Sequence, residues 1–156
     1  MSAQYHYFIS TLPMLRMDSE PVLDSETYLG QLRTVLVPAM LEAIRGLNRP
    51  PPVEPFCPAA KVWNALEVYV RNFVIRNRPD ADRRRAEEWT RHEPDVFPGL
   101  DNTLNDALNA PDPLEREKRL DHVRWNTLEE ARLARPFEID ALVVYRLRLL
   151  IAEKWA

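Results

Sequence analysis

The sequence predicts an all-α protein, a bundle of about five to seven helices with an extended or short β arm at its N-terminus. Only three residues are glycine, and the apolar stretches are rich in Leu and Ala, a composition that favours helices over sheets. Apolar residues also recur three and four positions apart, as on one face of a helix. With 46% hydrophobic and 29% charged residues, the chain is expected to form a single helical domain over residues 1–156.

The arm and a linker are predicted from local composition. Residues 5–13 are aromatic and β-branched and end at Pro13, which is typical of an extended segment or a short edge strand. Five prolines fall within residues 48–58, too many for a helix or a central strand. We therefore interpret residues 48–58 as a linker that separates an N-terminal helical hairpin from the main bundle.

The hairpin is predicted from helix start and stop signals. Asp24 or Ser25 can cap a helix that continues to about Val37. Pro38 suits the first turn of a second, shorter helix, which is expected to end near Gly46. The short connection between the two helices indicates that they lie side by side.

The main bundle is predicted to contain the longer helices. The strongest start signal is Asp112 followed by Pro113, a capping acid and a proline at the first helical position. Asp101 is expected to cap a shorter helix before it. The last helix is apolar nearly all the way round, which is typical of a central helix or of one covered by a partner. The predicted ranges are about 59–77, 80–92, 102–110, 112–135 and 138–155.

No catalytic, cofactor or metal site is predicted. The three histidines lack metal-ligand spacing, and the three glycines are too far apart to form a phosphate-binding loop. The single cysteine, Cys57, is flanked by prolines, and we expect no helix N-terminus there to lower its pKa. The chain is therefore predicted not to be an enzyme.

Arginine and tryptophan side chains are the candidate partner-binding residues. Both residue types are enriched where protein interfaces concentrate their binding energy. The run of arginines near Trp89 is interleaved with acidic residues, so it fits a salt-bridged solvent face, an acidic protein partner or RNA. Trp155 fits an interface or the core equally well. The candidates are Arg83, Arg84, Arg85, Trp89, Arg146, Arg148 and Trp155.

Four blocks of residues together resemble an uncharacterised bacterial family encoded beside V-type ATPases. The family is in turn similar to the C subunit of V-type ATPases, the helical part that couples the central stalk to the membrane ring. The blocks are Tyr5 to Leu15 with Pro21; Trp63 with Val70, Arg71 and Asn72; Asp112 to Glu115 with Arg124, Trp125 and Leu128; and Phe137 with Leu142, Tyr145 to Leu149 and Glu153 to Trp155.

The resemblance implies a non-catalytic subunit or accessory protein that acts as a helical coupling or assembly element. Its partners would be other V-type ATPase subunits, of the central stalk or the membrane ring. The residues themselves fit such a role, because an apolar last helix that carries Arg146 and Arg148 is able to pack on other helices while these arginines pair with acidic groups of a partner. The C subunit of V-type ATPases has three similar helical bundles, whereas this chain is much shorter. A complete socket for the stalk therefore does not follow from the resemblance.

Location and the alternatives follow from the same features. No segment reaches about 18 consecutive apolar residues, so no membrane insertion is expected. We expect a cytoplasmic protein, peripheral at the inner membrane if it joins an ATPase complex. The net charge of −3 argues against nucleic-acid binding. The alternatives are a helical protein–protein adaptor unrelated to ATPases, an RNA-binding module, and an enzyme whose site is assembled from distant residues.

Overall fold

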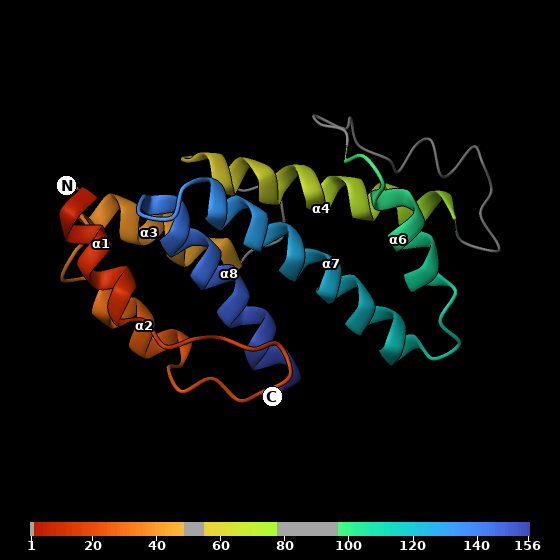
Figure 1. Ribbon diagram of the computed structural model, residues 1–156, viewed down its shortest axis with the longest axis horizontal. Helices are drawn as coiled ribbons and strands as arrows, with labels where there is room; N and C mark the ends of the chain where they lie inside the picture. The colour runs from red at the N-terminus through yellow and green to blue at the C-terminus, as the bar shows by residue number, and fades with distance from the viewer. Residues whose placement is uncertain (1, 49–54, 78–96) are drawn as a thin grey trace.

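The computed structural model describes residues 2–48, 55–77 and 97–156 (Figure 1). All regular secondary structure in these ranges is helical, which confirms the predicted all-α class. None of these helices is long and apolar enough to span a membrane. The elements are α1 Ser2–Thr11, α2 Ser25–Leu32, α3 Pro38–Arg45, the short 3-10 helix η1 Gly46–Asn48, α4 Pro58–Arg76, α6 Leu100–Leu108, α7 Pro113–Ala134 and α8 Ile139–Trp155.

Helix α8 lies at the centre of the fold. It packs against α7 along its length and also contacts α1, α2, α4 and η1. Figure 1 shows α8 between α2 on one side and α7 on the other. Ten of its 17 residues are buried, on all sides of the helix. Of the two predicted alternatives, a central helix or one covered by a partner, the structure shows a central helix.

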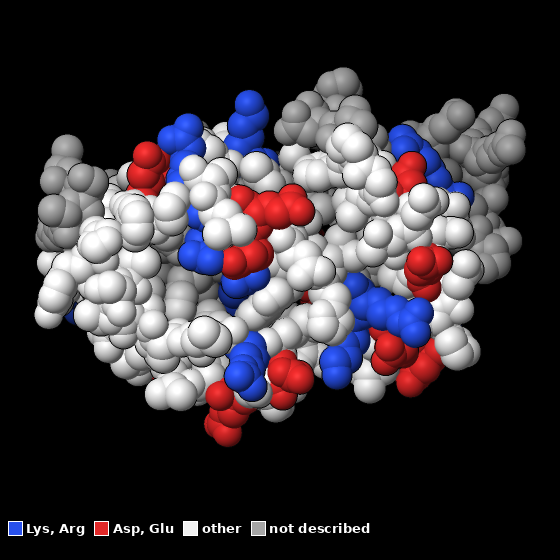
Figure 2. Space-filling model, in the orientation of Figure 1, with Lys and Arg blue, Asp and Glu red and all other residues white. Residues whose placement is uncertain are grey.

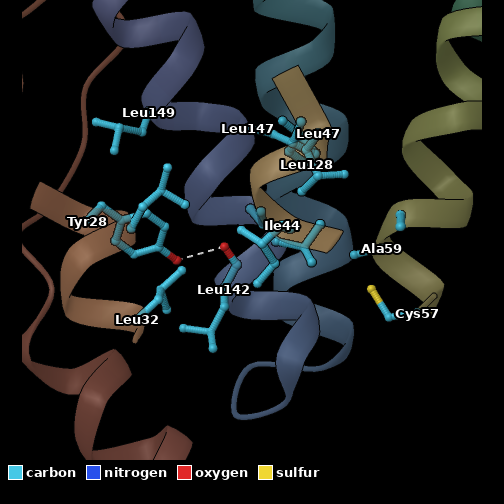
Figure 3. Packing of buried hydrophobic residues seen from close by; sticks show 14 of the residues in the cluster. Tyr28, Leu32, Ile44, Leu47, Cys57, Ala59, Leu128, Leu142, Leu147 and Leu149 are labelled. Atoms are coloured by element: carbon cyan, nitrogen blue, oxygen red, sulfur yellow. Dashed lines mark hydrogen bonds between the residues drawn. The ribbon is translucent and has the colours of Figure 1, made fainter. Parts of the chain in front are cut away.

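The described residues form two apolar clusters, and the larger one surrounds α8. In the larger cluster (Figure 3), Tyr28 and Leu32 of α2 and Ile44 of α3 pack against α8. The Tyr28 hydroxyl is buried and donates to the Leu142 carbonyl at 2.8 Å. The N-terminal hairpin therefore shares its core with the last helix of the chain.

The smaller cluster lies where α4, α6 and α7 meet. Its buried members are Leu66, Val70, Leu104, Ala107, Leu120 and Val123. Helices α4 and α7 also contribute Ala59, Ala60 and Leu128 to the larger cluster. These two long helices therefore connect the two clusters.

The N-terminal segment is a helix, so the predicted extended or β arm is wrong. Its aromatic and β-branched residues suit a strand, but Tyr5, Phe8, Ile9 and Leu12 are spaced as one helical face. That face packs on the larger cluster, with Phe8 fully within it. Burial of a helical stripe outweighs the weak local preference for extended backbone. Pro13 follows the end of the helix, because the residue before a proline disfavours helical backbone.

The predicted helix caps are partly confirmed. Asp24 caps α2 through Thr27 N–H at 2.7 Å, and Asp112 caps α7 through Leu114 N–H at 3.0 Å. Helix α2 ends at Leu32, short of Val37. The prediction that Asp101 caps α6 is wrong, because the cap is Gly99. The φ angle of Gly99 is 78°, a left-handed conformation that favours glycine.

Helix α4 is capped from a distant part of the chain. Its own N-cap residue, Cys57, makes no side-chain cap hydrogen bond. Instead the buried Asp140 of α8 accepts a hydrogen bond from Ala59 N–H at 2.7 Å. A carboxylate at a helix N-terminus also interacts favourably with the helix dipole. Asp140 thus fixes the start of α4 against the start of α8.

We expect Asp140→Ala to lower the free energy of unfolding by about 1–2 kcal/mol, because a buried helix N–H loses its acceptor. Asp140→Asn keeps an acceptor oxygen and should lose less. Glu138→Ala is the matched control, since Glu138 is exposed and lies two residues away. Urea unfolding curves measure all three variants. Equal losses for the Ala variants at 138 and 140 would contradict the capping role.

Candidate functional site

The predicted partner-binding residues fall in different places. Arg83, Arg84, Arg85 and Trp89 lie outside the described residues. The other three are on α8 and do not form one surface. Arg148 and Trp155 are seven residues apart and both bond to α7. Arg146 lies on the other side of α8. The groups that act on it there include Tyr28 and Glu26 of α2 and Arg45 of α3.

Trp155 belongs to a hydrogen-bonded network around a buried carboxylate. Asp121 of α7 is 2% exposed. Its Oδ2 accepts from Trp155 Nε1 at 2.7 Å and from Lys154 Nζ at 2.8 Å. Its Oδ1 accepts from Arg124 Nη1 at 2.7 Å. Three donors from two helices therefore satisfy one carboxylate.

The network continues to a third helix. Arg124 Nε also donates to Glu67 of α4 at 2.6 Å, and Lys154 pairs with Glu117 at 2.7 Å. Both partners in the Arg124–Glu67 pair are only 16% exposed. The result is an ion network, here called the Asp121 network, that joins α4, α7 and α8. Charge-assisted hydrogen bonds of this kind are among the stronger ones in proteins.

The Asp121 network sets the ionisation of its members. Burial opposes ionisation of Asp121, but hydrogen bonds from Lys154, Trp155 and Arg124 outweigh it and lower the pKa of the carboxyl below its usual 3.8. For Arg124, burial disfavours the charge, but the carboxylates of Glu67 and Asp121 dominate and raise its pKa. Both groups are therefore charged at neutral pH.

We expect Asp121→Asn to lower the free energy of unfolding at pH 7 by about 2 kcal/mol or more, because Arg124 and Lys154 lose a buried partner. Since folding lowers the pKa of Asp121, the wild-type advantage should persist above pH 4. It should shrink as the pH falls below the unfolded value of 3.8.

Glu117→Gln is the matched control, because Glu117 binds the same Lys154 but is 47% exposed. Solvent screening should keep its effect below about 1 kcal/mol. Denaturant titrations between pH 3 and pH 7 measure both variants. A constant difference between wild type and Asp121→Asn across that range would contradict the assignment.

Arg148 belongs to a second cluster of charged side chains between α7 and α8. Its Nη1 pairs with Glu129 at 2.8 Å, and its Nη2 donates to the Trp125 carbonyl at 3.0 Å. The guanidinium also lies over the Trp125 ring, 4.5 Å from the ring centroid, a favourable cation–π position. The Nε atom is buried and has no hydrogen-bond partner among the described residues.

A second arginine shares the same carboxylate. Arg132 donates to Glu129 through Nε at 3.0 Å and through Nη2 at 2.5 Å. The hydrogen bond from Arg132 is the largest cause of the lowered pKa of Glu129, and Arg148 adds to it. One carboxylate therefore faces two guanidinium groups.

These three side chains line a cleft of about 460 Å³ between α1, α7 and α8, a volume in the range of small binding sites. The opposite wall is the end of α1 and the segment after it. Tyr145 of α8 holds that wall by donating its hydroxyl to the Pro13 carbonyl at 2.8 Å. The apolar lining consists of Ile9, Leu12, Met14, Leu15, Ala141 and Val144. We call this the Arg148 cleft.

Arg146 is buried within the fold. It is 3% exposed, and its Nε and Nη1 have no hydrogen-bond partner among the described residues. Burial lowers the pKa of its guanidinium, while the charges of Glu153 and Glu26 act in the opposite direction. A partner protein would reach Arg146 only if the surrounding helices moved.

The outer face of this region carries both signs of charge. Figure 2 shows lysine and arginine beside aspartate and glutamate over the described surface in this view, with wide uncharged areas between them. Arg119 and Glu115, an exposed pair at 3.1 Å, are one example of opposite charges that lie together on the surface. The visible face is therefore not the single-sign surface that binds a nucleic-acid backbone.

Sequence reasoning missed the acidic partners, Asp121 and Glu129. Each lies three residues before an arginine of α7, Arg124 and Arg132. That spacing of opposite charges is visible in the sequence, and it predicts pairs on one helix face. Among the residues that the structure describes, no group of three or more His, Cys, Asp or Glu side chains is arranged to hold a metal ion.

Cys57 lies at the N-terminus of α4, so the expectation that its prolines keep it away from a helix start is wrong. Pro58 occupies the first turn, where proline is tolerated because its missing N–H is not needed. Backbone hydrogen bonds at the helix start favour the thiolate, but burial is the larger effect and raises the pKa of Cys57 to about 11.

We expect Cys57 to react slowly with a thiol reagent in the folded protein. At pH 8 a thiol of this pKa is about one part in a thousand thiolate, and the side chain is 8% exposed. Reaction with dithionitrobenzoate should therefore be much faster in denaturant. Equal rates in the folded and unfolded protein would contradict this prediction.

Comparison with known proteins gives a match to the C-terminal part of the sequence. A family model described as a protein of unknown function (DUF2764) matches residues 82–156. The matched part includes α6, α7 and α8, and with them Asp121, Glu129 and Arg148. No curated protein and no solved structure matches the chain significantly.

Proposed function

We propose that this chain is a non-catalytic subunit or accessory protein of a bacterial V-type ATPase, similar to the C subunit of those enzymes, and that it acts as a helical coupling or assembly element. Its partners would be other ATPase subunits of the central stalk or the membrane ring. It would work in the cytoplasm, peripheral to the inner membrane through the complex.

The observation that best supports the proposal is the Asp121 network. A coupling element must pass force from one partner to another without deforming. In this chain a buried ion network joins α4, α7 and α8, and α4 and α7 connect both apolar clusters. Close-packed interiors of this kind transmit strain.

The residues of the family resemblance also fit this proposal. Arg124, Lys154 and Trp155 belong to the blocks that carry the resemblance, and all three bind Asp121. Trp125 and Arg148 belong to the same blocks and stack on each other at the cleft. The resemblance thus coincides with the contacts that set the geometry of α7 and α8.

We expect ATPase subunits to copurify with a tagged copy of this protein from gently solubilised native membranes. Mass spectrometry should find peripheral ATPase subunits enriched over a parallel preparation from an untagged strain. Recovery should survive ribonuclease treatment, because the contact is between proteins.

The outcomes separate the alternatives. Recovery with other proteins but without ATPase subunits would favour a helical adaptor unrelated to ATPases and overturn the proposal. Recovery lost on ribonuclease treatment would favour the RNA-binding alternative, whose residues lie outside the described ranges. Recovery of the protein alone would contradict a docking role altogether.

A further inference from the structure

The Arg148 cleft carries an excess of positive charge. Its charged lining residues are Arg132, Arg148 and Glu129. Glu129 is shared between both guanidinium groups, which leaves one positive charge without a carboxylate in the lining. A carboxylate entering the cleft would therefore meet an attractive potential.

Hydrogen-bonding capacity is unused at the same place. Arg148 Nε is buried without a partner among the described residues. Because that atom is enclosed, the donors within reach of a ligand are those of Arg132, which is 40% exposed and bonds to Glu129 through Nε and Nη2. A carboxylate oxygen that enters the cleft would gain a charge-assisted hydrogen bond from the exposed guanidinium of Arg132.

The remaining walls are apolar and include a stretch of non-helical backbone. Residues 13–16 lie outside any helix. In the described part of the chain, no backbone–backbone hydrogen bond involves Met14 or Leu15. The Met14 side chain at the edge of the cleft is 84% exposed. An extended peptide laid along this wall would find both apolar side chains and backbone groups able to pair with its own.

We propose that the Arg148 cleft binds a short segment of a partner protein in which an acidic side chain is flanked by apolar side chains. The acidic group would bond to Arg132 and Arg148, and its apolar neighbours would pack on Ile9, Leu12 and Val144. The inference rests on the proposed docking role but not on the identity of the partner complex.

The main competitor is a fatty acid, which also combines a carboxylate with an apolar chain. The backbone of Met14 and Leu15 makes no backbone–backbone hydrogen bond among the described residues. This favours a peptide, because a peptide can pair with those groups and a hydrocarbon chain cannot. Decanoate is therefore included in the test as the alternative ligand.

The test begins with a selection of random 12-residue peptides displayed on phage against the whole protein. The Arg132→Gln variant serves for counterselection. We expect the enriched peptides to share an acidic residue beside apolar residues. The best peptide should bind about tenfold more tightly than its own Glu→Gln or Asp→Asn version in a fluorescence polarisation assay.

Matched variants localise the binding. Arg132→Gln should weaken the peptide about tenfold, whereas Arg119→Gln should not, because Arg119 is a similarly exposed arginine at the other end of α7. Met14→Glu places a negative charge at the edge of the cleft and should also weaken binding. Its control is Val22→Glu, at a similarly exposed loop position that does not line the cleft.

Any of three results would overturn the proposal. The first is that no peptide is enriched on the wild type relative to Arg132→Gln. The second is an enriched motif without an acidic residue. The third is that decanoate shifts the amide NMR signals of Val144 and Tyr145 and the selected peptides do not. The result is separable from that of the copurification. If a peptide binds but no ATPase subunit copurifies, the binding role of the Arg148 cleft stands and the proposed ATPase complex is rejected. If ATPase subunits copurify but no peptide binds, only the binding role of the cleft is rejected.

Discussion

The buried carboxylate of Asp121 is the constraint on which the rest of the structure depends. It accepts hydrogen bonds from Arg124 on its own helix and from Lys154 and Trp155 on α8. Arg124 extends the same network to Glu67 of α4. A carboxylate in this position is tolerated only because its donors are present, so the three helices are held in one relative arrangement. The Arg148 cleft lies between α7 and α8 and the end of α1, so its shape depends on how α7 and α8 are held together.

The fold could be predicted where the deciding contacts are local. Asp112 caps α7 through a hydrogen bond two residues away, and such a signal is complete within the sequence. The state of α1 is not decided locally, because its aromatic and β-branched residues suit a strand. The packing of the face that carries Phe8 on the larger cluster selects the helix. The cap of α4 by Asp140 is likewise invisible in the sequence, since 81 positions separate Asp140 from Ala59.

The candidate site could be predicted by residue type but not by position. Arg148 and Trp155 are candidates because their side chains concentrate binding energy, and the structure joins them to Glu129 and Asp121. Those pairings depend on how α7 and α8 rotate against each other, which is set by the buried faces of both helices. Arg146 has the same side chain as Arg148 but lies on the opposite side of α8, so residue type alone could not separate the two.

The spacing of Asp121 and Glu129 along α7 determines where the sequence can tolerate insertions and deletions. Asp121 and Glu129 both meet α8 from one continuous helix, and each residue turns a helix by about 100°. An insertion or deletion of a single residue between them would swing one carboxylate away from α8 while leaving the other in place. Insertions and deletions are therefore expected in the connections between helices, and the number of residues between Asp121 and Glu129 should stay constant.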